Sequence, residues 1–289
     1  MRNYLWPVFH YSLLLLLLTA FVYLSDSKHP LRIDLQHAVF DQFNKMEPRP
    51  ARDDVVIVDI DEASLKHLGQ WPWSRKIMAS LTQSLTEKGA KVIAFDGVFA
   101  EVDRTSPQYY LSQLPEGVNF PTEALGEEDL DYDAVFASAI KESKIFVTAF
   151  TYGQKTVEQR PVDKKRLLAR SDVKKKFIEN ASKFNGVAVN LPELAKNAAG
   201  NGSFMARPDA DGVLRRTAMV FSDGKNLYPS YSLEALRVAL TSRKGMVYLA
   251  ETPPDEKTEV DTDYRILLND KKLKIPVERD GIIHVYYRY

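Results

Sequence analysis

The pattern of hydrophobic and polar positions separates an apolar amino-terminal stretch from a long region of short strands and helices. Residues 5–24 carry no charged side chain. A helix of about 20 apolar residues can cross the hydrocarbon core of a bilayer, so this stretch predicts a transmembrane helix. Arg2 and the amino terminus place positive charge before it, which predicts an uncleaved signal anchor leading out of the cytoplasm. A cleaved secretory signal is the alternative.

A second helix is predicted shortly after this stretch. Leu31, Leu35, Val39 and Phe43 recur at four-residue steps, and Pro48 follows them. This spacing places the four side chains in one stripe along a helix that ends before the proline. Such a stripe packs either on its own domain or on a second copy of the chain, and the pattern leaves both uses open.

The next region alternates between strand and helix patterns. Residues 55–60 form a short apolar, β-branched run, which predicts a central strand covered on both faces. Ser74 can cap a helix that ends at Gly89, and residues 91–95 follow as a second strand. Strand, helix and strand within about 45 residues predict a βαβ unit with parallel strands and a right-handed crossover.

A second capped helix at 131–140 and a strand at 145–150 extend this pattern to βαβαβ. The predicted fold class is therefore α/β, with a mixed, mostly parallel sheet flanked by helices and preceded by the transmembrane helix. Residues 107–129 show no period and predict a long irregular insertion. Later segments predict a hairpin around a turn at 208–212, a helix from residue 229 or 230, and strands at 266–268, 273–275 and 282–286.

The composition narrows the classes of function. The 39 basic and 39 acidic residues cancel, so the chain has no overall field to hold a nucleic acid, and none is expected as a partner. The chain contains no cysteine, which excludes disulfides, thiolate metal sites and a cysteine nucleophile. We expect no cofactor and no catalytic residue.

Acidic residues gather where the two predicted strands end. Asp59 and Asp61 close the first strand, and Asp96 closes the second. Ligands of open α/β sheets bind at the carboxyl ends of the strands, so these positions predict a site for a small cationic or polyhydroxyl ligand or a hard metal ion. Nearby arginines can compensate the negative charge. The candidate ligand-binding residues are Asp59, Asp61, Trp71, Trp73, Arg75, Asp96, Glu101, Asp103 and Arg104.

Three alternatives to a ligand site stay open. In the first, which is purely structural, Asp59 or Asp61 caps a turn, and the tryptophans pack over the sheet edge. Asp96 then pairs with Arg75. In the second, the acidic residues and a metal form the centre of a membrane-tethered hydrolase, because an Asp-x-Asp at a strand end can supply a nucleophile and a proton-handling group. In the third, the helix at 31–43 only dimerises a receptor.

The order of these features resembles one family. The segments that carry the resemblance read VVIVDIDEASL, LGQWPWSR, GAKVIAFDGVF, PDADGVLRR and YPSYSLEAL. Together they are similar to the CHASE family of extracytoplasmic sensory domains, second type, over residues 30–289. The resemblance implies a periplasmic or extracellular input domain that stands in front of an output module such as an adenylate or guanylate cyclase or a histidine kinase.

The resemblance and the apolar pattern together predict a division of the chain. Residues 1–27 would be the anchor in the inner, cytoplasmic membrane, and residues 28–289 the sensory domain outside the cytoplasm. The last residues resemble the start of the family's closing strand region, so we expect the domain to continue past Tyr289. The expected partners are the membrane through residues 5–24, an unidentified small-molecule or ionic signal, and a second copy of the chain in a homodimer.

Overall fold

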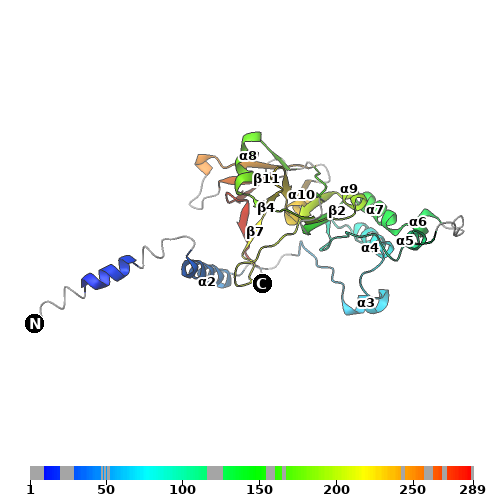
Figure 1. Cartoon of the computed structure of the whole chain (residues 1–289), viewed down its shortest axis with the longest axis horizontal. Helices are drawn as coiled ribbons and strands as arrows, with labels where there is room; N and C mark the ends of the chain where they lie inside the picture. The colour runs from blue at the N-terminus through cyan, green and yellow to red at the C-terminus, as the bar shows by residue number, and fades with distance from the viewer. Residues whose placement is uncertain are drawn as a thin grey trace, which may run out of the picture. The chain divides into compact units, whose positions relative to one another are not determined.

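The contacts of the chain divide it into two compact units. The first comprises Met1–Val58 with Tyr286–Tyr289, and the second comprises Asp59–Val285. All candidate residues of the predicted site fall in the second unit. The computed structural model (Figure 1) describes residues 10–19, 29–46, 48, 50, 53–115, 126–153, 160–164, 167–241, 245–256, 263–268 and 272–287.

The first unit contains helical residues 10–19 and helix α2, Pro30–Met46. Helix α2 confirms the prediction made from the four-residue apolar steps. None of its residues is buried, and the ring of Phe40 lies 5.4 Å from that of Tyr286, centroid to centroid. Among the residues described, no helix is both long and apolar enough to span a bilayer. The flanking parts of the predicted span, 5–9 and 20–24, lie outside the described residues.

The prediction of a buried central strand at residues 55–60 is wrong. These residues belong to no strand, and the side chains of Val55 and Ile57 are 78% and 88% exposed. In the described part of the chain, β1 (Ile93–Ala94), the intended neighbour, pairs with β2 (Phe146–Tyr152) and with no other strand. A β-branched run favours extended backbone, but a strand also needs a partner edge, and the sequence pattern carries no information on that partner.

The second unit opens with two capped helices. Asp61 caps α3 (Glu62–Leu68). Ser74 caps α4 (Arg75–Glu87) through its side-chain oxygen. Beyond α4, Gly89 has a φ of 84°, a left-handed conformation that glycine adopts without the steric cost paid by other residues. Both ends of α4 are therefore as predicted.

A four-stranded sheet follows, with β2 at its centre. β1 pairs in parallel with β2, and the chain between them passes through α7 (Tyr132–Ser143), which confirms a parallel βαβ crossover. β2 also pairs in parallel with β6 (Gly200–Ser203) and antiparallel with β5 (Val187–Ala188). Helices α4 and α7 pack against each other, and Figure 1 shows them side by side.

The core of this half forms where α4, α7 and the sheet meet. Met78 of α4, Phe136 and Ile140 of α7, and Phe146 of β2 are all at most 2% exposed. Burial of such side chains contributes about 1.5–3 kcal/mol each. This packing fixes the amino-terminal ends of the two helices, where the candidate residues lie.

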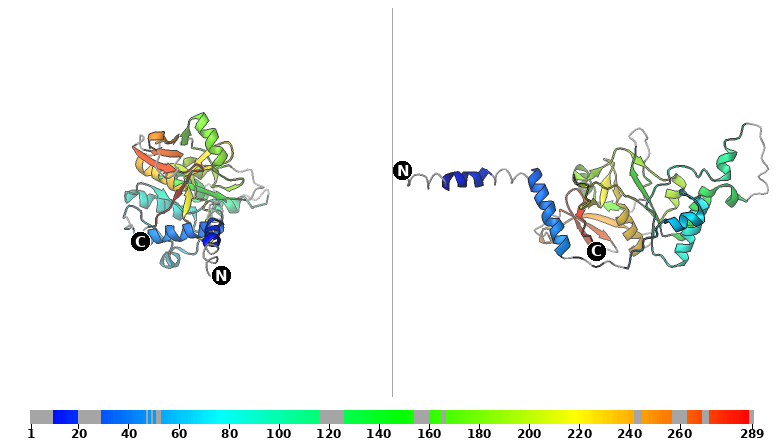
Figure 2. Two further views of the ribbon diagram at one scale, coloured as in Figure 1. Left: turned by 90° about the vertical axis from the view of Figure 1, so that its left-hand side faces the viewer. Right: turned by 90° about the horizontal axis from the view of Figure 1, so that it is seen from below.

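The other half of the second unit is built from short strands. β11 (Tyr264–Leu268) pairs antiparallel with β10 (Val247–Glu251) and β12 (Leu273–Val277), and β3 (Leu167–Ala169) pairs in parallel with β10. Figures 1 and 2 place these strands away from α4 and α7. The remaining elements are α5 Pro107–Leu111, α6 Glu127–Leu130, α8 Ser171–Asn180, β4 Ser182–Lys183, α9 Pro192–Asn197, β7 Arg216–Ala218, β8 Val220–Ser222, β9 Leu227–Pro229, α10 Tyr231–Thr241, a 3₁₀ helix Pro254–Glu256 and β13 Ile282–His284.

The fold is α/β with mixed sheets, and the prediction of a mostly parallel sheet is wrong. Parallel pairs join β1–β2, β2–β6, β3–β10 and β4–β8. Antiparallel pairs join β2–β5, β7–β13, β8–β9, β10–β11 and β11–β12. Parallel neighbours need a long crossover, whereas several strands of the carboxyl-terminal half follow one another after short connections, which favours antiparallel pairing.

The hairpin predicted around residues 208–212 is wrong, although its turn is right. The Gly212 N–H donates to the Asp209 C=O at 2.9 Å and closes a β-turn. The strand before the turn, β6, pairs with β2, and the strands after it, β7 and β8, pair with β13 and β9. A turn signal is local, whereas the partner of a strand is decided by packing between distant segments. The predicted helix from residue 229 or 230 is confirmed as α10.

Candidate functional site

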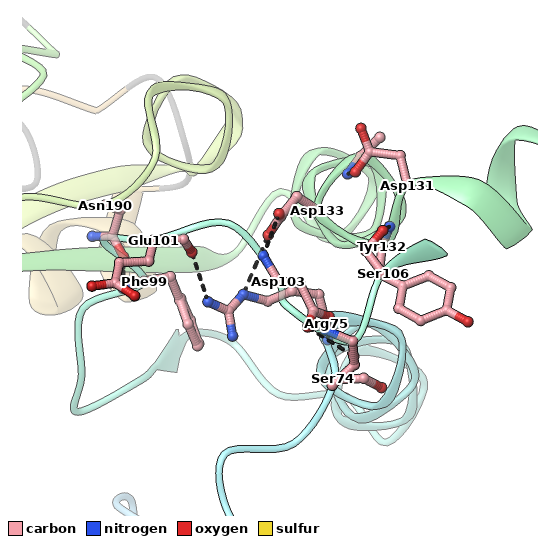
Figure 3. Close-up of polar contacts among 12 residues, drawn as sticks. Ser74, Arg75, Phe99, Glu101, Asp103, Ser106, Asp131, Tyr132, Asp133 and Asn190 are labelled. Carbon is pink, nitrogen blue, oxygen red and sulfur yellow. Dashed lines mark hydrogen bonds and ion pairs between the residues drawn. The ribbon is translucent and has the colours of Figure 1, made fainter. Parts of the chain in front are cut away.

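Arg75, the first residue of α4, lies at the centre of a cluster of polar contacts (Figure 3). Its backbone N–H donates to Asp103 Oδ2 at 2.6 Å, and its Nη2 donates to the Glu101 C=O at 3.2 Å. Its Nε lies 3.4 Å from Asp133 Oδ1 in an ion pair. A carboxylate at the amino end of a helix is stabilised by the helix dipole, so Asp103 fits its position beside α4. We refer to Arg75, Asp103 and Asp133 as the Arg75 cluster.

The two carboxylates of the cluster are linked through the loop after β1. The Asp103 N–H donates to Asp133 Oδ2 at 2.7 Å. Asp103 Oδ1 accepts from the N–H and the hydroxyl of Thr105, at 2.9 and 2.7 Å. Asp131, two residues before Asp133, caps α7 by accepting from the Ala134 N–H. The cluster therefore joins the loop around residue 103 to the amino ends of both α4 and α7.

The cluster is buried and carries an excess of negative charge. The side chains of Arg75 and Asp133 are each 11% exposed, and one guanidinium faces two carboxylates. Burial raises the pKa of Asp133 above the usual value of a carboxyl group, although the Asp103 N–H and the Arg75 charge oppose the rise. Burial likewise lowers the pKa of Arg75, against the attraction of both aspartates. Arg75 Nε and Asp133 Oδ1 make no hydrogen bond.

Four aromatic rings contact one another in series, starting beside the Arg75 cluster. The Arg75 guanidinium lies 4.3 Å from the centroid of Phe99, and Phe99 stacks on Phe95 at 4.8 Å. Trp71 lies 6.1 Å from Phe95 and 5.9 Å from Trp73, between ring centroids. Trp73 is buried, with its Nε1–H donating to the Gly69 C=O, whereas Trp71 is 42% exposed. We call Trp71, Trp73, Phe95 and Phe99 the aromatic row.

The other predicted site residues lie at the surface of the second unit. Asp59, Asp61 and Asp96 are exposed. Asp61 accepts at 2.8 Å from a backbone N–H in the first turn of α3. The Glu101 side chain pairs with Arg104 at 2.6 Å, and both are more than two-thirds exposed. The structure therefore brings Trp71, Trp73, Arg75, Asp103 and the backbone of Glu101 together around the cluster and the row.

Part of the structural alternative is confirmed and part is wrong. Asp61 caps a helix, as that alternative expects. Arg75, however, pairs with Asp133 and not with Asp96, because the start of α7 lies closer to α4 than the end of β1 does.

Sequence reasoning missed three residues of this region. Asp133 and Phe99 contact Arg75 directly. Asn190 Oδ1 accepts from the Phe99 N–H at 2.8 Å, and its Nδ2 donates to the Ala149 C=O at 2.5 Å. The second acid of the Asp131-x-Asp133 pattern offered a signal, because a capped helix needs only the first. Asn190 offered none, since it lies 91 residues from Phe99 along the chain.

The hydrolase alternative needs a metal held by several side chains. Among the described residues, no group of three or more His, Cys, Asp or Glu side chains could hold a metal ion. The described acidic residues therefore offer no such centre in this structure.

The comparisons with known proteins give one match. A family model described as the CHASE2 domain matches residues 13–289. No curated protein and no solved structure matches the chain.

Proposed function

The chain belongs to the CHASE2 domain family, a family of extracellular, non-catalytic sensory domains, and we propose that it is the input domain of a membrane-bound signal-transduction receptor. The match over residues 13–289 carries this proposal. The domain lies outside the cytoplasm, binds a small signal and passes the change through the membrane. An output module of the cyclase or histidine kinase type receives it, and that module lies outside these residues.

The Arg75 cluster and the aromatic row support a sensory role for one face of the second unit. Trp71, between Phe95 and Trp73 in the row, offers an exposed ring. Phe99, at one end of the row, touches Arg75, whose cluster holds the starts of α4 and α7. A ligand that moves Trp71 or Phe95 thus acts on both helices through one series of contacts. We propose this face as the signal-binding site.

The location of the domain can be tested with a reporter joined after Tyr289. Alkaline phosphatase needs disulfides, which form outside the reducing cytoplasm. We expect the fusion to be active in a bacterial host, with little activity from a matched fusion that lacks residues 5–24. A fluorescent protein that matures only in the cytoplasm should give the opposite pattern at the same position. An inactive phosphatase and a bright fluorescent fusion would contradict the proposal.

We also propose that the receptor is a homodimer joined through α2. The stripe on this helix is unusually open: Leu31, Leu35 and Phe43 are 58%, 61% and 63% exposed. A continuous apolar stripe in water favours association, and two anchored copies meet at a high local concentration.

A further inference from the structure

We propose that the exposed part of the aromatic row, formed by Trp71 beside Phe95, binds a small organic ammonium ion. This inference rests on the proposed sensory function and names the chemical class of its signal. The ammonium group would lie against the ring of Trp71, beside Phe95, and the charge of the surrounding residues would select a cation.

The exposure of Trp71 is the first observation. Trp71 and Trp73 are near neighbours in sequence and pack edge to face, yet Trp73 is 6% exposed and Trp71 42%. The ring of Phe95, which is partly buried, also lies near Trp71, at 6.1 Å between centroids, so a second ring adjoins the exposed one. The face of an aromatic ring attracts a cation within about 6 Å of its centre, and tryptophan attracts it most strongly.

The same row already holds a cation at its buried end. The Arg75 guanidinium lies 4.3 Å from the centroid of Phe99, and Phe99 stacks on Phe95 at 4.8 Å. The Arg75 guanidinium therefore occupies one end of the row, and Trp71, two rings further along, presents an exposed ring. The cation–ring contact that the protein makes at Phe99 is the contact we assign to Trp71.

The local charge favours a cation over an anion. The Arg75 cluster has two carboxylates for one guanidinium, and Asp96, directly after Phe95, is exposed. The Asp96 carboxylate is close enough to Tyr231 to add to the rise that burial causes in the pKa of that phenol. The Tyr231 hydroxyl donates to the Phe95 C=O at 2.7 Å. Negative charge thus lies just after β1, at the residue that follows Phe95.

These observations also separate an ammonium ion from the other ligands considered. A hard metal ion needs several oxygen ligands, and the described residues contain no group of three or more acidic, histidine or cysteine side chains that could hold one. A neutral polyhydroxyl ligand could donate hydrogen bonds to a carboxylate but has no net charge for the carboxylates to attract, and it does not use the exposed face of Trp71 as a cation does. An ammonium ion with methyl or methylene groups uses both the rings and the carboxylates.

Gly97 fixes the position of Phe95. A Cβ added at Gly97 would lie 2.6 Å from Cε1 of the Phe95 ring, which is closer than carbon atoms approach. The ring therefore rests against the backbone of Gly97, and Gly97→Ala would displace it while leaving both Phe95 and Trp71 in the sequence. This variant tests the position of the Phe95 ring without removing either ring.

The test measures binding of choline to the full chain in detergent by isothermal titration calorimetry. The matched probe is 3,3-dimethylbutan-1-ol, which has the same shape and no charge. We expect saturable binding of choline and at least tenfold weaker binding of the neutral alcohol. Equal binding of the two probes, or no saturable binding of choline, would overturn the inference.

Variants locate the site. Trp71→Ala should weaken choline binding at least tenfold, Trp71→Tyr should retain most of it, and Gly97→Ala should weaken it. Tyr110→Ala removes another exposed ring, 63% exposed, outside the row and should leave binding unchanged. Circular dichroism melting checks that each variant is folded. If Trp71→Ala binds choline like the unchanged chain, the site is wrong.

The outcome is independent of the reporter fusions described above. A chain that is exported but does not bind choline would refute the ammonium site alone. A chain that binds choline through Trp71 but faces the cytoplasm would refute the extracytoplasmic input role and leave the site standing.

Discussion

The Asp133 carboxylate is buried beside the guanidinium of Arg75. The Asp103 carboxylate also acts on this guanidinium, and the Asp103 N–H donates to Asp133. One positive charge cannot compensate two negative charges in a site with little water, so ionised Asp133 is held at a cost. The raised pKa of Asp133 expresses this cost. The folded-state pKa of Asp133 lies above its unfolded-state value. The stability that protonated Asp133 contributes to the folded state is therefore fully present below the unfolded-state pKa and is lost as the pH rises through the folded-state pKa.

The variant Asp133→Asn should therefore change the pH dependence of stability. Asparagine does not ionise, so we expect the free energy of unfolding of the variant, relative to that of the unchanged chain, to increase as the pH rises from below the unfolded-state pKa through the folded-state pKa of Asp133. Urea unfolding followed by tryptophan fluorescence measures it. The control Asp129→Asn alters a carboxylate that is 48% exposed and should show no such trend. A trend of opposite sign would contradict the cause given for the pKa shift.

At this scale the sequence identified the residues that follow a local rule. Acids near strand ends and the Trp-Pro-Trp-Ser-Arg turn pointed to Trp71, Arg75 and Asp103, and the structure brings these together. The sequence did not predict a role for Asp133 in the site, because Asp133 follows a helix cap and was interpreted as part of the helix. Asp59 shows the limit of the rule, because the strand that should have carried it into the site does not form.

Among the elements, the loop after β1 depends on one amide side chain. Asn190 accepts from the Phe99 N–H and donates to the Ala149 C=O, so it ties this loop to β2. Its side chain is 3% exposed, and both of its backbone partners lie where water cannot replace it. The aromatic row and the Arg75 cluster therefore depend on a residue that contacts neither Trp71 nor Arg75.

Asn190→Ala should destabilise the second unit by about 2 kcal/mol or more, because it leaves a buried N–H and a buried C=O without partners. Denaturant unfolding gives the value. Asn180→Ala serves as the control, since Asn180 is exposed at the end of α8 and donates to a carbonyl of its own helix. A loss below about 0.5 kcal/mol in both variants would show that the loop is held by other contacts.

The predictions succeed for the four longest helices and for the parallel pair β1–β2, and they fail for the other strand partners that were predicted. α2, α4, α7 and α10 follow from caps and apolar spacing, which are local signals. The segment before the 208–212 turn was expected in a hairpin, and strand β6 there instead pairs with β2, because β2, whose first five residues are buried, is the central strand of its sheet. Partner choice depends on residues tens of positions away, so the amount of antiparallel pairing could not be inferred from single segments.

At the scale of the whole molecule, the dimer can be tested by crosslinking. The chain has no cysteine, so a single introduced thiol reports only on its own position. Leu35→Cys, in the stripe, should give a disulfide-linked dimer on mild oxidation in membranes. Gln36→Cys points about 100° away around the helix and should give at least fivefold less. Equal yields from both positions would indicate random collision and contradict a specific α2 interface.

The backbone passes between the two units twice, after Val58 and after Val285. The first passage of the backbone between the units follows the exposed residues 55–58, of which Val55, Val56 and Ile57 are more than three-quarters exposed. Extended, unpaired backbone of this kind is what a protease active site accepts. One cut there would leave α2 on one product and the whole second unit on the other, joined by contacts such as that of Phe40 with Tyr286. The residues that fail to form a strand are thus a place where a single cut would leave the two products held together by non-covalent contacts alone.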